Sequence, residues 1–385
     1  MQHENDKEKK YDKELFSPAD VREDDMEQIN RPSRTFWQDA FRALRKNVAA
    51  MISLIALLLI VFFAIFGPMM NEYTPREQDL SRSNLPPKVP VLENIGWLGM
   101  DGQETYVFEN ITAEQAQTNA ESRFGNEDYV QYETLSEGDG SVGSAQVQVS
   151  VDSYAAAGVE ENNFWFGTDR LGRDQWTRTW DGTRVSLFIA LIATLLDLFI
   201  GVAYGGISGF FGGKTDNILQ RILEVLSGIP NLVILILMIV VLDPGILSIS
   251  LAIAITGWIG MSRIVRGEIL KLKNEEFVLA SQTLGLSNSK VITKHLVPNT
   301  MGLIIINTMF TIPNAIFFEA FLSFIGLGLQ PPNASLGVLI DNGFDALQTT
   351  PHVLIFPAVV LSVLMIAFNI LADGMRDAFD PKMRD

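Results

Sequence analysis

The stretch NEEFVLASQTLGLSNSKVITKHLVPN, from Asn274 to Asn299, lies between two apolar segments and is patterned as two short helices around a glycine. Asn274 is a favourable N-cap, and Glu275 and Glu276 suit the positive end of a helix dipole. The small and apolar residues that follow recur at helical spacing and share one face: Phe277, Ala280, Ser281 and Leu284. We therefore expect a short helix whose exposed face can dock into another protein.

The rest of the stretch predicts a turn and a second helix. Gly285 can take the left-handed conformation that ends a helix. Ser287 or Asn288 can cap a second short helix, which must stop before Pro298 because the residue preceding proline is disfavoured in the helical region. This helix would run through Val291, Ile292 and His295. The alternative is a solvated loop that is helical by chance.

The composition indicates a membrane protein. Of the 385 residues, 48% are hydrophobic, and these are concentrated in runs rather than spread periodically. The net charge of -16 argues against a nucleic-acid partner, because no basic patch is present to neutralise phosphates. The chain has no Cys, which excludes disulfides, thiolate metal sites and a Cys nucleophile.

Six apolar segments are long enough to cross a bilayer, which needs about twenty residues. The first is not a cleavable signal peptide, because it follows a long acidic tail and ends at Gly67-Pro68 without a small-residue cleavage site. The six expected spans are Ala49–Phe66, Val185–Phe211, Ile218–Leu242, Ile246–Ile264, Met301–Leu327 and Val353–Leu371. The fold class predicted is an all-α polytopic membrane protein with an inserted extracellular domain.

Basic residues near the span ends predict the orientation, because Lys and Arg favour the cytoplasmic side. Five of them precede the first span: Arg31, Arg34, Arg42, Arg45 and Lys46. The long segment after that span has few basic residues and many acids. We therefore expect both termini and the loop at 265–299 to be cytoplasmic, in a multi-pass protein of the cell membrane.

The remaining segments divide by composition. Residues 1–30 read as a disordered acidic tail, 31–48 as an amphipathic helix on the inner leaflet, and 374–385 as a second cytoplasmic tail. The segment at 166–184 alternates acids with basic residues, which predicts a paired, interface-lying amphipathic segment. These basic residues are Arg170, Arg173, Arg178 and Arg184, and the acids are Asp169, Asp174 and Asp181.

The segment at 71–165 predicts a small extracellular domain that contains β-strands. AQVQVSVDS alternates valines with polar residues, and ETYVFENI and DYVQYETL read similarly. SEGDGS is a turn signal. A disordered acidic loop is the alternative, although aromatic residues such as Tyr106 and Tyr129 favour folding.

No motif supports a catalytic site. GFFGGKT lacks the first glycine of a phosphate-binding loop, the three His residues lie far apart, and no G-x-S-x-G is present. The spans of the sequence contain three acids that are costly in lipid unless paired or facing water: Asp197, Glu224 and Glu319. They are candidates for the translocation pathway or for helix packing.

Together these residues resemble the membrane permeases of ATP-binding-cassette importers, and within them the C-type subunit of oligopeptide and dipeptide permeases. The family's coupling motif reads E-A-A, three residues, Gly, nine residues, I-x-L-P. Ala280, Gly285 and Pro298 match it, whereas Leu279, Ser281, His295 and Val297 depart from it. EFVLAS…KHLVPN is closer to the peptide-permease variant, with Glu276 as its acid.

Three other segments carry the same resemblance: FGTDRLGRDQWTRTWDGTRVSL, FEAFLSFIGLGLQPPNASLG and AFNILADGMRDAFDPKMR. The resemblance covers roughly residues 34–66 and 163–384. It excludes most of the extracellular segment, which is expected to be longer than is usual in the family.

The resemblance implies the type I importer permease fold and a set of partners. These would be a homologous second permease, two ATPases that bind ATP and Mg, and a lipid-anchored or periplasmic peptide-binding protein, with membrane lipids around the chain. The chain itself would bind no cofactor or metal and would not be an enzyme. The ATPase-coupling residues would be Glu276, Phe277, Ala280, Ser281, Leu284, Gly285, His295 and Pro298, with Pro298 starting the fifth span. A permease for nickel or another small solute is the alternative.

Overall fold

The computed structural model describes residues 36–379 except 94, 96, 97, 126, 140, 142 and 331. The predicted tail at 1–30 and the end of the predicted tail at 374–385 lie outside the described residues. Within the described part, five helices are long and apolar enough to cross a membrane, and a sixth span exists if one bent helix pair is counted as one. The predicted all-α membrane architecture is therefore confirmed, and a small sheet accompanies it.

Long helices form the bundle. They are α2 (Val48–Phe66), α5 (Gln175–Phe211), α8 (Ile246–Leu272), α12 (Met301–Leu322) and α14 (His352–Phe379). The bent pair consists of α6 (Gly213–Ser227) and α7 (Asn231–Leu242). Shorter helices are α1 (Phe36–Lys46), α9 (Glu276–Thr283), α10 (Asn288–Val291), α11 (Val297–Asn299) and α13 (Leu336–Asp345).

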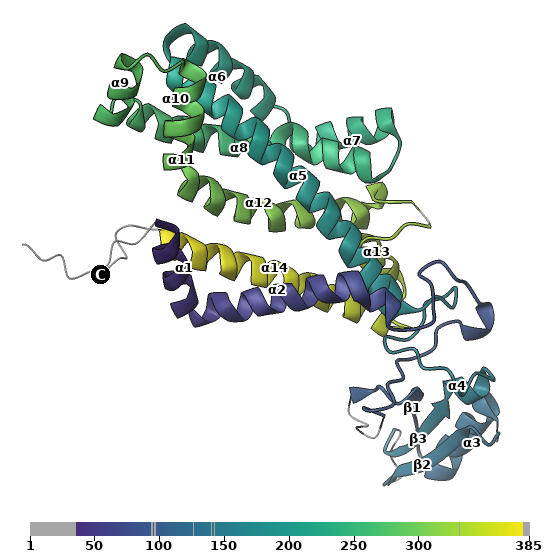
Figure 1. Ribbon diagram of the computed structural model, residues 1–385. Coiled ribbons are helices and arrows are strands. Elements are labelled where there is room, and N and C mark those ends of the chain that lie inside the picture. The colour runs from purple at the N-terminus through teal and green to yellow at the C-terminus, as the bar shows by residue number, and fades with distance from the viewer. Residues whose placement is uncertain are drawn as a thin grey trace, which may run out of the picture.

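The elements divide between two ends of the bundle (Figure 1). The α9–α10 region, α1 and the end of α14 lie at one end, where Trp37 of α1 meets Phe379 of α14 edge to face. The three-stranded sheet lies beyond the opposite end. The 274–299 loop and the inserted domain are thus separated by the length of the bundle.

Several boundaries differ from the prediction; α8, for example, ends at Leu272 rather than at the predicted Ile264. The helix α5 begins at Gln175 with Asp174 as its N-cap, so the second half of the predicted interfacial segment is the start of this span. The predicted third span is broken by an 80° bend, because Pro230 has no N–H and cannot continue α6. The last helix continues to Phe379, eight residues beyond the predicted end of its span.

Glycines allow α5 and α8 to pack backbone to backbone. Gly201, Gly205 and Gly209 recur every four residues and therefore share one face of α5. A Cβ atom at Gly205 would lie 2.4 Å from the carbonyl oxygen of Ser262, and one at Gly201 would lie 2.6 Å from Cβ of Met261. Small residues of this kind bring helices together in membranes, where lipid is as apolar as the side chains.

The inserted domain contains an antiparallel sheet in the order β1-β3-β2. Its strands β1 (Gln103–Asn110), β2 (Val130–Glu137) and β3 (Ala145–Asp152) lie where the alternating segments predict them. The helix α3 (Ala113–Phe124), which was not predicted, packs on the sheet and buries Ala116 and Ala120. The described part of this segment is therefore folded, in contrast to the disordered alternative.

Candidate functional site

The first half of the 274–299 loop forms the short helix α9. Its N-cap is Glu275 rather than the predicted Asn274, and the side chain of Glu275 makes no capping hydrogen bond. Gly285 has a φ of +83°, the left-handed conformation that the pattern predicts for this position. An added Cβ there would meet nothing within 4 Å, so backbone conformation is what requires glycine.

Burial divides α9 into an inner and an outer side. Val278 is fully buried, and Ser281 is only 8% exposed, with its hydroxyl donating a hydrogen bond to the carbonyl of Phe277 at 2.7 Å. The apolar residues on the outer side are Phe277, Leu279, Ala280 and Leu284. Ser281 therefore lies on the inner side, contrary to the predicted contact face, and Leu279 belongs to the outer side instead.

The inner side of the loop is fixed to the bundle by an apolar cluster. Val278, Val291 and Leu296 are fully buried and pack with Ile269 of α8 and Ile304 of α12. This base comes from both short helices of the loop and from two spans. The loop is thus packed onto the bundle rather than being a solvated connection, and none of residues 36–379 that the structure describes buries its outer apolar residues.

The second half of the loop continues into α12 without the predicted stop. A wide π-type turn at Ile292–Leu296 precedes α11, and Pro298 is the second residue of α11. The wider turn accommodates the proline within a nearly continuous helical path. His295 is half-buried in this turn, and its carbonyl accepts a hydrogen bond from the amide of Asn299 at 2.6 Å. His295 and Pro298 shape the connection, and neither belongs to the exposed apolar residues of α9.

Glu319 joins three elements deep in the bundle. It is fully buried and accepts hydrogen bonds from the hydroxyls of Ser186 on α5 at 2.8 Å and of Ser323 at 2.9 Å. The Ser186 hydroxyl in turn accepts from the backbone N–H of Leu336 at the start of α13. These contacts support helix packing rather than the pathway as the role of this residue.

The other two acids lie in contrasting places. Asp197 is 2% exposed and accepts a hydrogen bond from the hydroxyl of Thr311 on α12 at 2.8 Å. Glu224 does not face the interior as expected: its side chain is 56% exposed and pairs with the 82% exposed Arg221 on the same helix. Asp197 therefore links α5 to α12 by a hydrogen bond, whereas Glu224 lies on an outer face of α6.

We expect the replacement of Glu319 to destabilise the bundle in proportion to the hydrogen bonds that are lost. Glu319→Gln keeps the volume but one of the two amide positions cannot accept, whereas Glu319→Ala leaves both serine hydroxyls without this acceptor. An unsatisfied buried polar group costs about 1–3 kcal/mol. The midpoint of thermal unfolding in detergent should fall in the order wild type, Gln, Ala. Glu224→Gln is the control, and an equal midpoint for it and Glu319→Ala would contradict this role.

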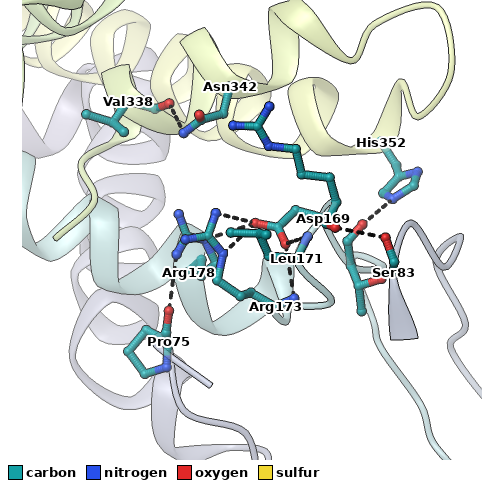
Figure 2. Close-up of polar contacts among 11 residues, drawn as sticks. Pro75, Ser83, Asp169, Leu171, Arg173, Arg178, Val338, Asn342 and His352 are labelled. Atoms are coloured by element: carbon teal, nitrogen blue, oxygen red, sulfur yellow. Dashed lines mark hydrogen bonds and ion pairs between the residues drawn. The ribbon is translucent and has the colours of Figure 1, made fainter. Parts of the chain in front are cut away.

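The segment at 166–184 forms a polar cluster where the inserted domain meets the bundle (Figure 2). The carboxylate of Asp169 forms an ion pair with Arg173 at 2.6 Å and lies 3.8 Å from the guanidinium of Arg178. Arg178 also donates a hydrogen bond to the carbonyl of Pro75. His352 at the start of α14 lies 3.1 Å from the carbonyl of Thr168. The predicted pairing of acids with bases is confirmed for Asp169 and for Asp181, which pairs with Arg184, whereas Asp174 bonds Thr177 and Asn71 instead. Asp169, Arg173 and Arg178 are buried rather than at an interface.

A glycine in this segment indicates that the segment packs closely against another part of the backbone. Gly172 has a φ of +68°, and an added Cβ would lie 1.8 Å from the carbonyl oxygen of Asp79. Asp174 caps α5 by accepting a hydrogen bond from the N–H of Thr177 at 2.8 Å, and burial raises the pKa of its carboxyl. The G-T-D-x-x-G-R-D pattern therefore fixes the loop before α5 against the segment that leaves α2.

Two family models match this sequence. The model described as "Binding-protein-dependent transport system inner membrane component" matches residues 201–385, and "N-terminal TM domain of oligopeptide transport permease C" matches residues 35–87. The first match contains the whole 274–299 loop with its exposed apolar residues. The second contains α1 and α2.

Curated relatives match almost the whole chain. The oligopeptide transport system permease protein OppC of Bacillus subtilis (strain 168) is 39% identical over 372 residues, which cover 97% of this chain and 98% of that protein. The dipeptide transport system permease protein DppC of Lactococcus lactis subsp. cremoris (strain MG1363) is 39% identical, with 93% and 94% covered. OppC of Escherichia coli (strain K12) is 32% identical, with 93% and 95% covered. These matches extend through the inserted domain, contrary to the expectation that similarity excludes most of it.

Proposed function

Because the chain belongs to the family of oligopeptide and dipeptide transport permeases of the ATP-binding-cassette importers, we propose that it forms half of a peptide pathway. A homologous second permease would supply the other half. Support comes from relatives at 39% identity that are named for oligopeptide and for dipeptide transport. Those names do not favour the alternative of a nickel permease.

The observation that carries the coupling proposal is the exposed apolar patch of α9, which consists of Phe277, Leu279, Ala280 and Leu284. Leu284 is 81% exposed and Leu279 is 49% exposed, although the base beneath them is fully buried. An exposed apolar patch on a water-facing surface usually marks a site that a partner protein covers. We infer that this patch inserts into a groove on a partner ATPase, which would bind ATP and Mg and supply the hydrolysis.

The proposed orientation places the patch in the cytoplasm and the inserted domain outside. The basic residues near the spans favour this arrangement. The separation of the two features by the length of the bundle supports it, because both then lie outside the membrane on opposite sides. The inserted domain would face an external peptide-binding protein and contribute to its docking.

Peptide uptake by cells that lack this chain tests the proposal. Labelled peptides of two to about six residues would be supplied to cells with the chain deleted, restored, or restored with a disrupted patch. We expect uptake to disappear on deletion and to return only with the intact chain. Labelled nickel is the control solute. Unchanged peptide uptake in the deletion strain, or a loss of nickel uptake alone, would refute the peptide assignment.

A second measurement isolates the partner. The purified chain should retain an ATP-binding-cassette ATPase of the same cells through detergent extraction. ATP hydrolysis by this complex should rise when peptide and its binding protein are added. Purification of the chain with the second permease but without any ATPase would contradict the coupling proposal and leave the peptide assignment to the uptake experiment.

A further inference from the structure

An ion pair links α6 to α8 close to the base of the 274–299 loop. The guanidinium of Arg266 donates two hydrogen bonds to the carboxylate of Asp216, from Nε to Oδ1 and from Nη2 to Oδ2, each of 2.6 Å. The hydroxyl of Ser208 on α5 donates to the same carboxylate at 2.6 Å. Because both carboxylate oxygens are engaged by a planar fork, this geometry fixes direction as well as distance.

The Arg266 side of this pair is part of the rigid base. The carbonyl of Arg266 lies 2.9 Å from the position of a Cβ at Gly209, so α8 and α5 are in backbone contact there. One turn further along α8, Ile269 packs with Val278 of the loop. The amine of Lys273, the C-cap of α8, donates to the carbonyl of Gly209 at 3.1 Å. Movement of the loop therefore carries Arg266 with it.

The Asp216 side belongs to a helix with a different path. The connection from α5 to α6 passes through two glycines with positive φ, Gly212 and Gly213, which fix the direction of the chain only weakly. The far end of α6 turns by 80° into α7 at Pro230. Such a break at membrane depth is tolerated where the backbone faces protein or a water-filled cavity. The α6–α7 pair is thus a bent element. Besides the ion pair, it is attached to α8 by the buried Leu223, which packs with Trp258 and Ile259.

We propose that the ion pair between Asp216 and Arg266 is a positioning contact that, together with the apolar contact of Leu223, makes α6 and the bent α7 move with the 274–299 loop. This inference rests on the proposed coupling of that loop to an ATPase. Motion imposed on α9 reaches α8 through the buried base, crosses to α6 through the ion pair and turns the α6–α7 bend. The pair transmits the motion and contacts neither peptide nor nucleotide.

Asp216→Asn and Arg266→Lys test this role in the complete complex with its permease and ATPase partners. Both remove the bidentate contact, and Arg266→Lys also retains the charge. We expect ATP hydrolysis to stay within about twofold of wild type and peptide uptake per ATP to fall about tenfold, within the range of 5–150-fold typical of coupling between sites. The exchange Asp216→Arg with Arg266→Asp should recover part of the uptake.

The exposed pair on the same helix provides a matched control. Arg221→Gln and Glu224→Gln remove an ion pair of 2.6 Å whose side chains are 82% and 56% exposed. We expect both to leave uptake per ATP unchanged. If Asp216→Asn impairs assembly of the complex, the uptake per ATP of Arg266→Lys alone tests the inference. An equal proportional loss of hydrolysis and uptake in Arg266→Lys would show that the pair only maintains the fold, and would overturn the inference.

A measured distance between α6 and α10 distinguishes transmission of motion from a purely structural role of the ion pair. The chain has no Cys, so Arg221→Cys on α6 and Ser289→Cys on α10 would be the only spin-labelling positions on it. In wild-type background the distance between the labels should be the same without nucleotide and with trapped ATP. With Asp216→Asn it should change or broaden on trapping. Identical behaviour in both backgrounds would overturn the inference. A wild-type chain that binds no ATPase would instead refute the proposed function.

Discussion

Replacement of Gly205 by alanine is expected to lower the stability of the bundle. The new Cβ would lie 2.4 Å from the carbonyl oxygen of Ser262 and 3.0 Å from the backbone nitrogen of Arg266. Both neighbouring atoms belong to the backbone of α8, so no side-chain rotation can relieve the overlap. The two helices must move apart, and overpacking of this kind costs about 1–3 kcal/mol. The midpoint of thermal unfolding of the detergent-solubilised protein measures this loss.

Gly260→Ala is the matched control for that measurement. Gly260 lies on α8, it is exposed, and an added Cβ meets nothing within 4 Å. Because alanine is about 1 kcal/mol more favourable than glycine within a helix, this variant should be as stable as wild type or more stable. The two substitutions add the same methyl group, so opposite effects on the unfolding midpoint would assign the difference to the close contact of Gly205 on α5 with Ser262 on α8. Equal midpoints would show that α5 and α8 tolerate separation and would contradict this prediction.

Elements whose formation depends on neighbouring residues in the sequence were predicted correctly. Gly285 takes a positive φ because a helix that turns sharply at its end needs one, and the alternation of valines in 145–151 marks β3 because successive strand residues face opposite sides. The apolar runs marked most spans. These features depend on residues within one or two turns of each other, which a single sequence contains.

Features that depend on the rest of the fold could not be predicted in this way. Val278 and Phe277 are adjacent apolar residues of α9, and only the packing of the loop against α8 and α12 decides that Val278 is buried. A pattern of small and apolar residues therefore placed Ser281 on the wrong side. The bend at Pro230 was missed because α6 is amphipathic and α7 is strongly apolar, so hydrophobicity averaged over both helices still suggests one span.

Buried acids pose the same problem. Glu319 and Glu224 look alike in sequence, each within an apolar stretch, yet one is fully buried among serines and the other is mostly exposed. The partners of Glu319 come from Ser186, 133 residues earlier, and from Ser323 four residues later. Only the nearer partner lies within reach of a helical pattern. The assignment of a buried acid to packing therefore needs the tertiary structure.

Ala280→Glu is expected to abolish association with the ATPase while leaving the chain folded. Ala280 is exposed within the apolar patch and its side chain is not part of the buried base. In a closed complex the new carboxylate would be buried without a partner, which is strongly destabilising. Substitution at the centre of a contact often costs 2 kcal/mol or more, so affinity should fall about 30-fold or more. Co-purification with the ATPase and peptide-stimulated hydrolysis would both report the loss.

The control for Ala280→Glu adds the same charge to the same helix outside the patch. Gln282 is exposed and polar, so Gln282→Glu changes the net charge of α9 equally without placing a carboxylate among Phe277, Leu279 and Leu284. We expect this variant to retain the ATPase, and both variants to unfold at the wild-type midpoint because neither touches Val278 and its buried neighbours. Loss of the ATPase in both would indicate charge repulsion rather than insertion of the patch. Retention in both would move the docking surface away from α9, because an apolar groove that closes over Ala280 cannot accept an unpaired carboxylate without a measurable loss of affinity.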